Sequence, residues 1–105
     1  MVTENNSNDT CLTISIAKEF DAEEARASRD HFEKIASNWQ GDVIIDLNDV
    51  DFLDSSGIGA IVFLHKRLIS RDCNLKLSGV GGQPQDVIKM LGVDRVIPTT
   101  LRESR

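Results

Sequence analysis

A short and nearly continuous apolar run, Val-Ile-Ile-Asp-Leu, occupies residues 43–47. Strands that helices cover on both faces have this pattern, because neither face meets water. The run therefore predicts a central strand of a largely parallel sheet. With 105 residues, the chain has room for one domain, in which one such sheet carries a few packed helices.

An alternating segment at residues 10–17 predicts a strand before the central one. Polar and apolar residues take turns along it, which places the apolar ones on a single face. These apolar residues are Leu12, Ile14 and Ile16. The preceding residues 1–9 are mostly polar, and we expect them to form a frayed N-terminal tail.

Helical spacing predicts a first helix from about Asp21 to Trp39. Asp21 stands three residues before Glu24, which is the spacing of an N-cap and its partner in a capping box. Apolar residues then recur one helical turn apart, at Phe32, Ile35, Ala36 and Trp39. We expect Gly41 to end this helix, because glycine readily adopts the left-handed conformation found after helices.

Further helices and strands follow the central run. In chain order they are a loop at 48–51, a helix from Ser55 or Ser56 to about Arg71, a strand from Leu75 to Gly79, a helix over 85–91 with Pro84 in its first turn, and a strand over 93–97. Strands that alternate with helices indicate an α/β domain, here with a sheet of about four mostly parallel strands. We expect the domain to span residues 10–98 and a polar C-terminal tail to span 99–105.

The charge balance argues against two classes of partner. Seventeen acidic and twelve basic residues give a net charge of −5. Nucleic-acid binding depends on clustered Lys and Arg that neutralise phosphates, and anionic membrane surfaces attract the same residues. The apolar runs are also far shorter than the ~18 residues that span a bilayer. We therefore expect neither a nucleic acid nor a membrane as partner.

The two chain ends and the cysteines add an expectation about compartment. The polar and acidic N-terminus lacks the basic and apolar stretches of a signal peptide, so we expect a cytoplasmic protein. Cys11 and Cys73 lie far apart and match no metal motif. We expect both to be reduced thiols that pack as small hydrophobic side chains.

The segment Asp54–Gly59, Asp-Ser-Ser-Gly-Ile-Gly, carries the most chemical information. Asp54, Ser55 and Ser56 can each accept hydrogen bonds from free N–H groups at a helix start. Two glycines within one turn are unfavourable in a helix and indicate close approach by another backbone or by a partner. A helix N-terminus also tolerates added negative charge. Helix capping, phosphate binding, phosphorylation and nucleophilic catalysis all stay open at this segment.

Catalysis is the least favoured of these four roles. A serine nucleophile needs a base within hydrogen-bond reach, usually a histidine. His31 falls in the middle of the first predicted helix. His65 follows Ser55 by about ten residues, which is about 15 Å along the same helix.

Phosphate binding is also weakly supported. The sequence has no Lys or Arg between residues 34 and 66, and it lacks the lysine-containing phosphate loop. Four carboxylates that repel phosphate crowd the segment instead: Asp46, Asp49, Asp51 and Asp54. We interpret Asp46 and Asp49 as strand-end and turn residues rather than as metal ligands.

Four residues of the second helix lie outside its apolar stripe. Phe63 either joins the core or, if exposed beside Ala60, forms a hydrophobic docking patch. Basic residues gather near the helix C-terminus, where they suit the helix dipole, and we interpret them as solvated. These are Lys66, Arg67 and Arg71.

The hexapeptide at residues 54–59 resembles the D-S-[ST]-G-[LI]-G signature of the STAS domain, in its bacterial anti-sigma factor antagonist branch. The resemblance covers about Leu12 to Pro98, including residues 19–22, 44–53 and 87–96. The chain departs from the family pattern at Lys18, where the family commonly has glycine.

This resemblance implies a non-enzymatic STAS domain that acts as a switch, without cofactor or metal. In the family, the serine after the motif aspartate is phosphorylated by a serine kinase of the histidine-kinase-like ATPase type, often the anti-sigma factor itself. Unphosphorylated antagonist binds that kinase, and a metal-dependent serine phosphatase resets the switch. By position the acceptor is Ser55, with Ser56 as the alternative.

The implied partner-binding surface consists of Asp21, Asp54, Ser55, Ser56, Gly57, Ile58 and Gly59. A competing hypothesis keeps the fold but not the switch. In that case the chain is a STAS subunit that assembles with a larger complex, such as a transporter, and is never phosphorylated.

Overall fold

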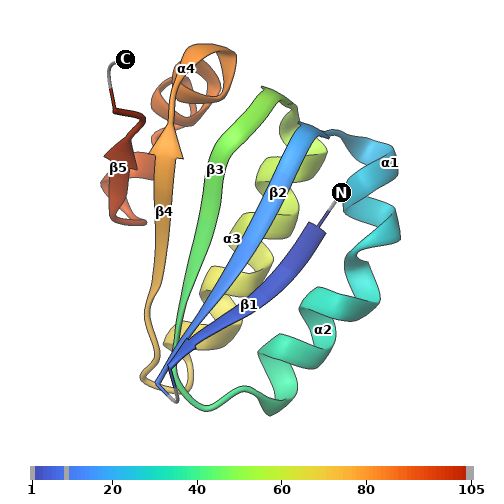
Figure 1. Ribbon diagram of the computed structural model, residues 1–105, viewed down its shortest axis with the longest axis vertical. Helices are drawn as coiled ribbons and strands as arrows, with labels where there is room; N and C mark the ends of the chain where they lie inside the picture. Colours follow the sequence, from blue (N-terminus) through green and yellow to red (C-terminus); the bar gives the residue numbers. More distant parts are fainter. Residues whose placement is uncertain (1, 9, 104–105) are drawn as a thin grey trace.

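The computed structural model describes residues 2–8 and 10–103 and shows one twisted sheet with helices packed on it (Figure 1). The strands are β1 (Val2–Asn8), β2 (Cys11–Phe20), β3 (Asp42–Leu53), β4 (Leu75–Val80) and β5 (Thr99–Leu101). The helices are α1 (Ala22–Ala27), α2 (Arg29–Asn38), α3 (Ser55–Ile69), α4 (Gly82–Met90) and the 3-10 helix η1 (Val93–Arg95).

The order of the strands in the sheet follows their order in the chain, from β1 to β5. β1 pairs antiparallel with β2, and every other neighbouring pair is parallel. The α/β class and the mostly parallel sheet are confirmed, although the described residues form five strands rather than about four.

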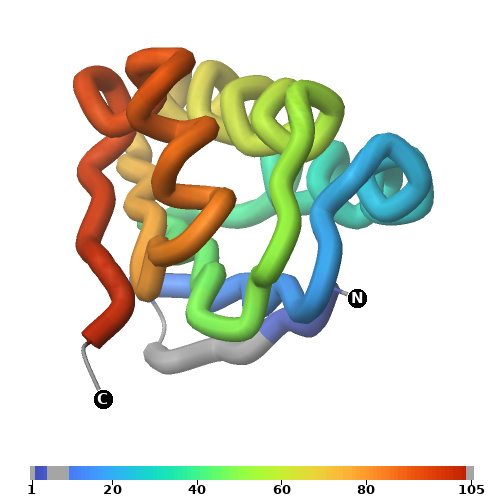
Figure 2. Tube along the Cα trace, turned by 90° about the horizontal axis from the view of Figure 1, so that it is seen from above, coloured from blue at the N-terminus to red at the C-terminus, as the bar shows by residue number. Residues whose placement is uncertain are grey.

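The helices cover one face of the sheet, as the view from above shows (Figure 2). Along β3, burial alternates: Val43 and Ile45 are buried, whereas Ile44 and Asp46 are half-buried on the opposite face. The prediction that helices cover this strand on both faces is therefore wrong. Ile44 lies between its sheet neighbours Thr13 and Lys76, which shield one apolar side chain on the open face.

The core lies between the sheet and the helices. Residues Leu12, Ile14 and Ile16 of β2 are buried on one face, which confirms the predicted alternation. They pack with residues of β3, β4 and the apolar faces of α2 and α3 in one cluster. Phe20 and Phe32 contact each other in this cluster, with ring centroids 6.0 Å apart. The Asp54–Gly59 segment therefore adjoins a well-packed core.

Both edge strands lie in segments that the sequence predicts as tails. β1 takes up residues 2–8 of the expected N-terminal tail and pairs with β2. β5 follows Pro98, whereas residues 93–95 of the predicted last strand form η1. Both corrections have one cause: main-chain pairing with a neighbouring strand of the sheet holds these short segments, and side-chain periodicity does not report it. Residues 1, 9, 104 and 105 of the predicted tails lie outside the described residues.

The first helix and the loop after the central run also differ from the prediction. The expected single helix is divided at Ser28, whose hydroxyl donates to the Glu24 carbonyl at 2.8 Å, a bond that bends helices. Residues 48–51, expected as a loop, continue β3 with an irregular register. Arg102 donates to the Leu47 and Val50 carbonyls at 3.2 and 3.1 Å, and so satisfies part of this irregular stretch.

The backbone explains why glycine is needed at residue 41 and would be favoured at residue 18. Gly41 does not end the helix, because the cap is at Trp39; instead, a Cβ at Gly41 would lie 2.6 Å from the Thr10 carbonyl oxygen. Lys18, at a register shift in β2, has a φ of 68°. That left-handed conformation favours glycine, in keeping with the glycine that the resemblance to the STAS pattern leads us to expect at this position.

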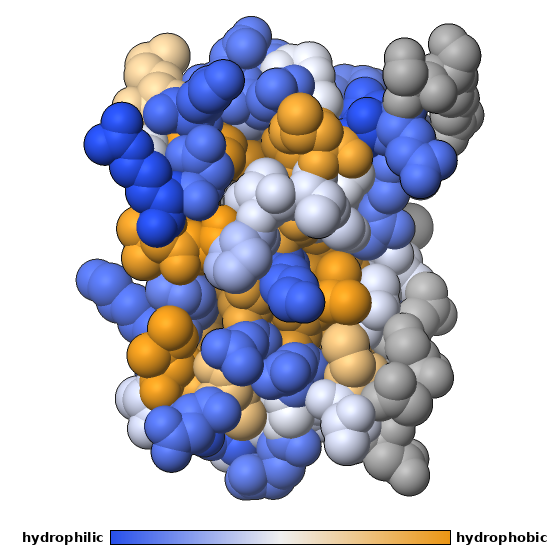
Figure 3. All heavy atoms as spheres, turned by 90° about the vertical axis from the view of Figure 1, so that its left-hand side faces the viewer, coloured by the Kyte–Doolittle hydropathy of each residue, from blue (hydrophilic) through white to orange (hydrophobic). Residues whose placement is uncertain are grey.

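The edge formed by β5 carries scattered apolar surface between charged residues (Figure 3). The exposed large hydrophobic residues of α4, η1 and β5, and of the turns beside them, are Met90, Leu91, Val96 and Leu101.

Candidate functional site

Asp54 is the N-cap of α3, and its carboxylate fixes the first turn. One oxygen, Oδ1, accepts hydrogen bonds from the Ser56 N–H at 2.9 Å and the Gly57 N–H at 3.0 Å. The helix begins at Ser55, as the sequence predicts. Because the cap already uses these two donors, a free phosphate ion has fewer backbone partners at this helix start.

Asp21 and Asp54 occupy equivalent places at the ends of neighbouring strands. Phe20 and Leu53 pair in register, and each is followed by an aspartate that caps a helix. Asp21 Oδ1 accepts from the Glu24 N–H at 3.0 Å, which confirms the predicted cap. The structure thus brings the starts of α1 and α3 together at the carboxyl ends of β2 and β3, where both helix dipoles present their positive ends.

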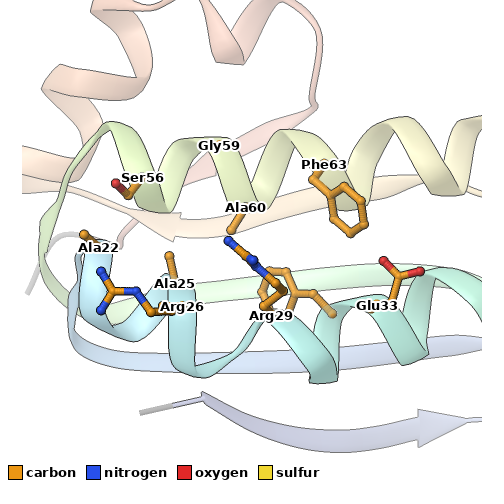
Figure 4. A pocket seen from close by; sticks show the side chains of 10 residues that line it. Ala22, Ala25, Arg26, Arg29, Glu33, Ser56, Gly59, Ala60 and Phe63 are labelled. Atoms are coloured by element: carbon orange, nitrogen blue, oxygen red, sulfur yellow. The ribbon is translucent and has the colours of Figure 1, made fainter.

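Ser55 and Ser56 are both exposed on the first turn of α3. Within the described part of the chain, neither hydroxyl has a hydrogen-bond partner, since Asp54 does the capping. Ser56 lines the groove between α3 and the α1–α2 segment (Figure 4). Both hydroxyls are therefore accessible to another molecule.

The two glycines of the motif have different surroundings. A Cβ at Gly57 would lie 2.2 Å from the Phe20 carbonyl oxygen and 2.7 Å from a Leu53 methyl carbon, so Gly57 lets α3 pack against the sheet. A Cβ at Gly59 would meet nothing within 4 Å. The prediction of close approach by another backbone is confirmed at Gly57, whereas Gly59 faces open space beside the groove. Ile58, between them, is buried in the core.

Gln83, in the first turn of α4, supports the site in a way that sequence analysis missed. Its side-chain amide accepts from the Leu53 N–H and donates to the Leu53 carbonyl, both at 2.8 Å. A neighbouring strand would make the same two bonds. Gln83 therefore holds the end of β3 immediately before Asp54, and no local sequence pattern signals a contact between residues 30 positions apart.

Sequence analysis also missed Arg26 and Arg29, which line the groove from the α1–α2 side (Figure 4). Their spacing of three residues on a helix was the available signal. The groove itself is formed by helices that are separated in the sequence, so the pattern of either helix alone does not reveal it.

Neither histidine lies beside the motif serines. His31 Nε2 contacts Glu4 Oε2 on β1 at 2.5 Å. His65 is buried on α3, and desolvation lowers the pKa of its imidazole below 6.5. The arrangement therefore does not place an imidazole base next to Ser55.

Asp46, on β3 before the motif, holds the local backbone through Asn48. Asp46 Oδ1 accepts from the N–H and side-chain amide of Asn48. The interpretation of Asp46 and Asp49 as strand-end and turn residues is wrong, because both lie within β3 and pair with β2. Among the described residues, no group of three or more His, Cys, Asp and Glu side chains is arranged to hold a metal ion. In the same part of the chain, no helix has both the length and the apolar character needed to cross a membrane.

Of the basic residues at and just after the end of α3, Lys66 is exposed as expected, whereas Arg67 and Arg71 are not simply solvated. Arg71 donates to the Ala36 and Trp39 carbonyls and so ties α3 to the end of α2. Arg67 pairs with Glu33 at 3.1 Å, and its guanidinium lies 5.5 Å from the centre of the Phe63 ring. Their interpretation as solvated residues is corrected: both stabilise the packing of α2 on α3.

Comparison with known proteins identifies the family. The model of the STAS domain matches residues 3–105, so the chain belongs to the STAS domain family. A putative anti-sigma factor antagonist from Thermotoga maritima superposes with a TM-score of 0.84 at 20% identity, covering 94% of this chain and 85% of that one. The Bacillus cell fate determinant SpoIIAA in its phosphorylated form superposes with a TM-score of 0.76 at 15% identity, covering 94% and 90%.

The same fold occurs in a transporter context. A sulfate transporter family protein from Wolinella succinogenes superposes with a TM-score of 0.72 at 17% identity, covering 86% of this chain and 75% of that one. At these identities the likeness shows the fold. No curated protein matches the chain.

Proposed function

We propose that this STAS domain is a phosphorylation-controlled protein-binding switch of the anti-sigma factor antagonist kind, acting in a bacterial partner-switching pathway in the cytoplasm. The observation that carries this proposal is the division of labour in the first turn of α3. Asp54 caps the helix, and the exposed hydroxyls of Ser55 and Ser56 are left without a structural task. A kinase can therefore modify them without dismantling the helix.

The charge at this site supports control by phosphate. A phosphoserine adds about −1.5 to −2 charges at pH 7, which takes the net charge from −5 to about −7. The positive end of the helix dipole stabilises that charge by about 0.3–1 kcal/mol at an exposed site, so the fold tolerates it. An acidic partner surface does not, because like charges in a partly desolvated interface cost several kcal/mol.

The proposed partners are a serine kinase of the histidine-kinase-like ATPase type, which can itself be the anti-sigma factor, and a metal-dependent serine phosphatase. The unmodified chain binds the kinase through the surface around Asp21 and the segment Asp54–Gly59. A binding role is favoured over catalysis because His31 and His65 lie on other surfaces or in the core.

Intact-mass analysis after incubation with ATP and candidate serine kinases tests this function. The wild-type chain and Ser56→Ala should each gain one phosphate, whereas Ser55→Ala should gain none. A gain that persists in Ser55→Ala but disappears in Ser56→Ala moves the acceptor to Ser56. If none of the kinases encoded beside the gene for this chain phosphorylates it, that result contradicts the switch.

The similarity to the sulfate transporter family protein favours a second candidate, a STAS subunit that assembles with a larger complex without phosphorylation. Co-purification from the native cell separates the two. If the chain is a switch, a kinase should co-purify only with the unmodified protein. If it is an assembly subunit, the same complex should co-purify with Ser55→Asp as with wild type.

A further inference from the structure

A groove of about 490 Å³ begins at the motif and runs between α3 and the α1–α2 segment (Figure 4). From α3 it is lined by Ser56, Gly59, Ala60 and Phe63, which lie on one face at helical spacing. From Ser56 to Phe63 this face extends for about 10 Å, which is two turns of a helix. The groove is therefore long enough for a short helical segment.

The floor of the groove lies close to the backbone. Gly59 has no side chain, and the space above it is empty to 4 Å. Alanines line the groove on both sides, so that the backbone of another segment can approach closely. Phe63, 37% exposed, supplies an aromatic wall and is not part of the core cluster. Its use as a docking patch stays a prediction.

The charge of the groove is opposite to that of the chain. Arg26 and Arg29 are exposed along it, and within the described residues neither guanidinium has a hydrogen bond or an ion pair. The groove's own acid, Glu33, is already paired with Arg67 at 3.1 Å. Two uncompensated positive charges therefore line an apolar groove in a chain whose net charge is −5.

We propose that this groove receives an amphipathic helix of the partner protein, with apolar side chains on the floor and flanking carboxylates on Arg26 and Arg29. Helices dock into apolar grooves through residues at i, i+3, i+4 and i+7. Guanidinium groups bind carboxylates with paired, charge-assisted hydrogen bonds, which favours an acidic helix over a basic one. The inference rests on the proposed protein-binding function and specifies the chemistry of the partner.

A pair of model helices tests the proposal without the natural partner. One peptide of about 14 residues carries leucines at i, i+3, i+4 and i+7 with flanking glutamates, and the other carries lysines in place of the glutamates. In NMR titrations of the isotope-labelled chain, the acidic peptide should shift the groove resonances and bind about tenfold more tightly than the basic one. Equal affinities, or shifts confined to another surface, would overturn the proposal.

Three variants sharpen the titration. The double variant Arg26→Glu/Arg29→Glu should reverse the preference between the peptides. Gly59→Leu should abolish binding of both, because its side chain fills the open space and meets no atom within 4 Å of its Cβ. A matched control, Lys89→Glu/Arg95→Glu, changes two exposed basic residues beyond the groove and should keep the wild-type preference. A loss of preference in that control would show a general charge effect and contradict the assignment.

Other occupants have their own signatures. Concentration-dependent self-association in sedimentation experiments that Gly59→Leu removes would assign the groove to a second copy. Groove shifts with dodecyl phosphate at lower concentrations than with the acidic peptide would assign it to a small anionic amphiphile. Either result would overturn the proposal that a partner helix occupies the groove. Because peptide binding does not need Ser55, Ser55→Ala should bind normally, so a failed kinase assay and a failed groove assay are distinguishable.

Discussion

The two glycines of the Asp54–Gly59 segment lie on opposite sides of α3 and do different work. Gly57 faces the ends of β2 and β3, where no room exists for a methyl group. Gly59 faces the groove, where a side chain would meet nothing within 4 Å. Two residues on a helix turn by about 200°, so one short motif supplies both a packing face and an open face. The comparison teaches that the motif joins a rigid support to an accessible surface.

The packing face should be the more sensitive of the two to substitution. A Cβ at residue 57 would stand 2.2 Å from a backbone oxygen, which cannot move without moving β2. We expect Gly57→Ala to lower the free energy of unfolding by about 3 kcal/mol, as overpacked cores do. Urea denaturation measures it, and an unchanged midpoint would show that α3 shifts freely on the sheet.

The cap of α3 should have the next largest effect. Asp54→Ala removes the acceptor of two N–H groups and should cost about 1–2 kcal/mol of stability. Ser55→Ala is the matched control and should change stability by less than about 0.5 kcal/mol, because its hydroxyl caps nothing. Equal losses from both variants in thermal unfolding would contradict the assignment of the cap to Asp54.

Acid should lower the free energy of unfolding through His65, which is buried on α3. Burial lowers the pKa of this imidazole in the folded chain, so the unfolded chain takes up the proton more readily. Its contribution to stability is complete above pH 6.5 and is lost as the pH falls below that value. Histidine titrates between about pH 5 and 8, so denaturation curves should be recorded across that range. The free energy of unfolding should fall as the pH falls for wild type and fall less for His65→Gln. Identical pH profiles would exclude His65 as the source.

The open face should gain stability from a small side chain. Gly59→Ala replaces a helix-interior glycine without a clash and should stabilise the chain by about 0.5–1 kcal/mol. If the same variant also weakens binding to the acidic model peptide, the glycine is retained for contact rather than for stability. A destabilised Gly59→Ala would instead place an unrecognised contact in the groove.

Much of the scaffold was predictable from sequence because the patterns that define it are local. The alternation in β2, the start of α3 at Ser55 and the cap at Asp54 all depend on residues within a few positions. The edge strands β1 and β5 depend on main-chain pairing with β2 and β4, and their polar or short sequences carry no period of their own. The break at Ser28 depends on one side-chain hydrogen bond to Glu24.

The candidate site was predictable in part for the same reason. The motif is continuous in the sequence, so Asp54, Ser55 and Gly57 could be given roles directly. Gln83 and the arginines of the groove come from other helices, and only the fold brings them to the motif. The positive φ of Lys18 is likewise invisible without the backbone, since lysine is an unexpected residue for that conformation.

The central claim is that phosphate on Ser55 controls partner binding without altering the fold. Isothermal titration calorimetry of the unmodified and the Ser55-phosphorylated chain with the cognate kinase tests it most directly, with melting temperatures recorded for both forms. We expect binding to weaken at least ~100-fold on phosphorylation while the melting temperature stays nearly constant. Equal affinities of the two forms, or a melting temperature that collapses on phosphorylation, would contradict the switch.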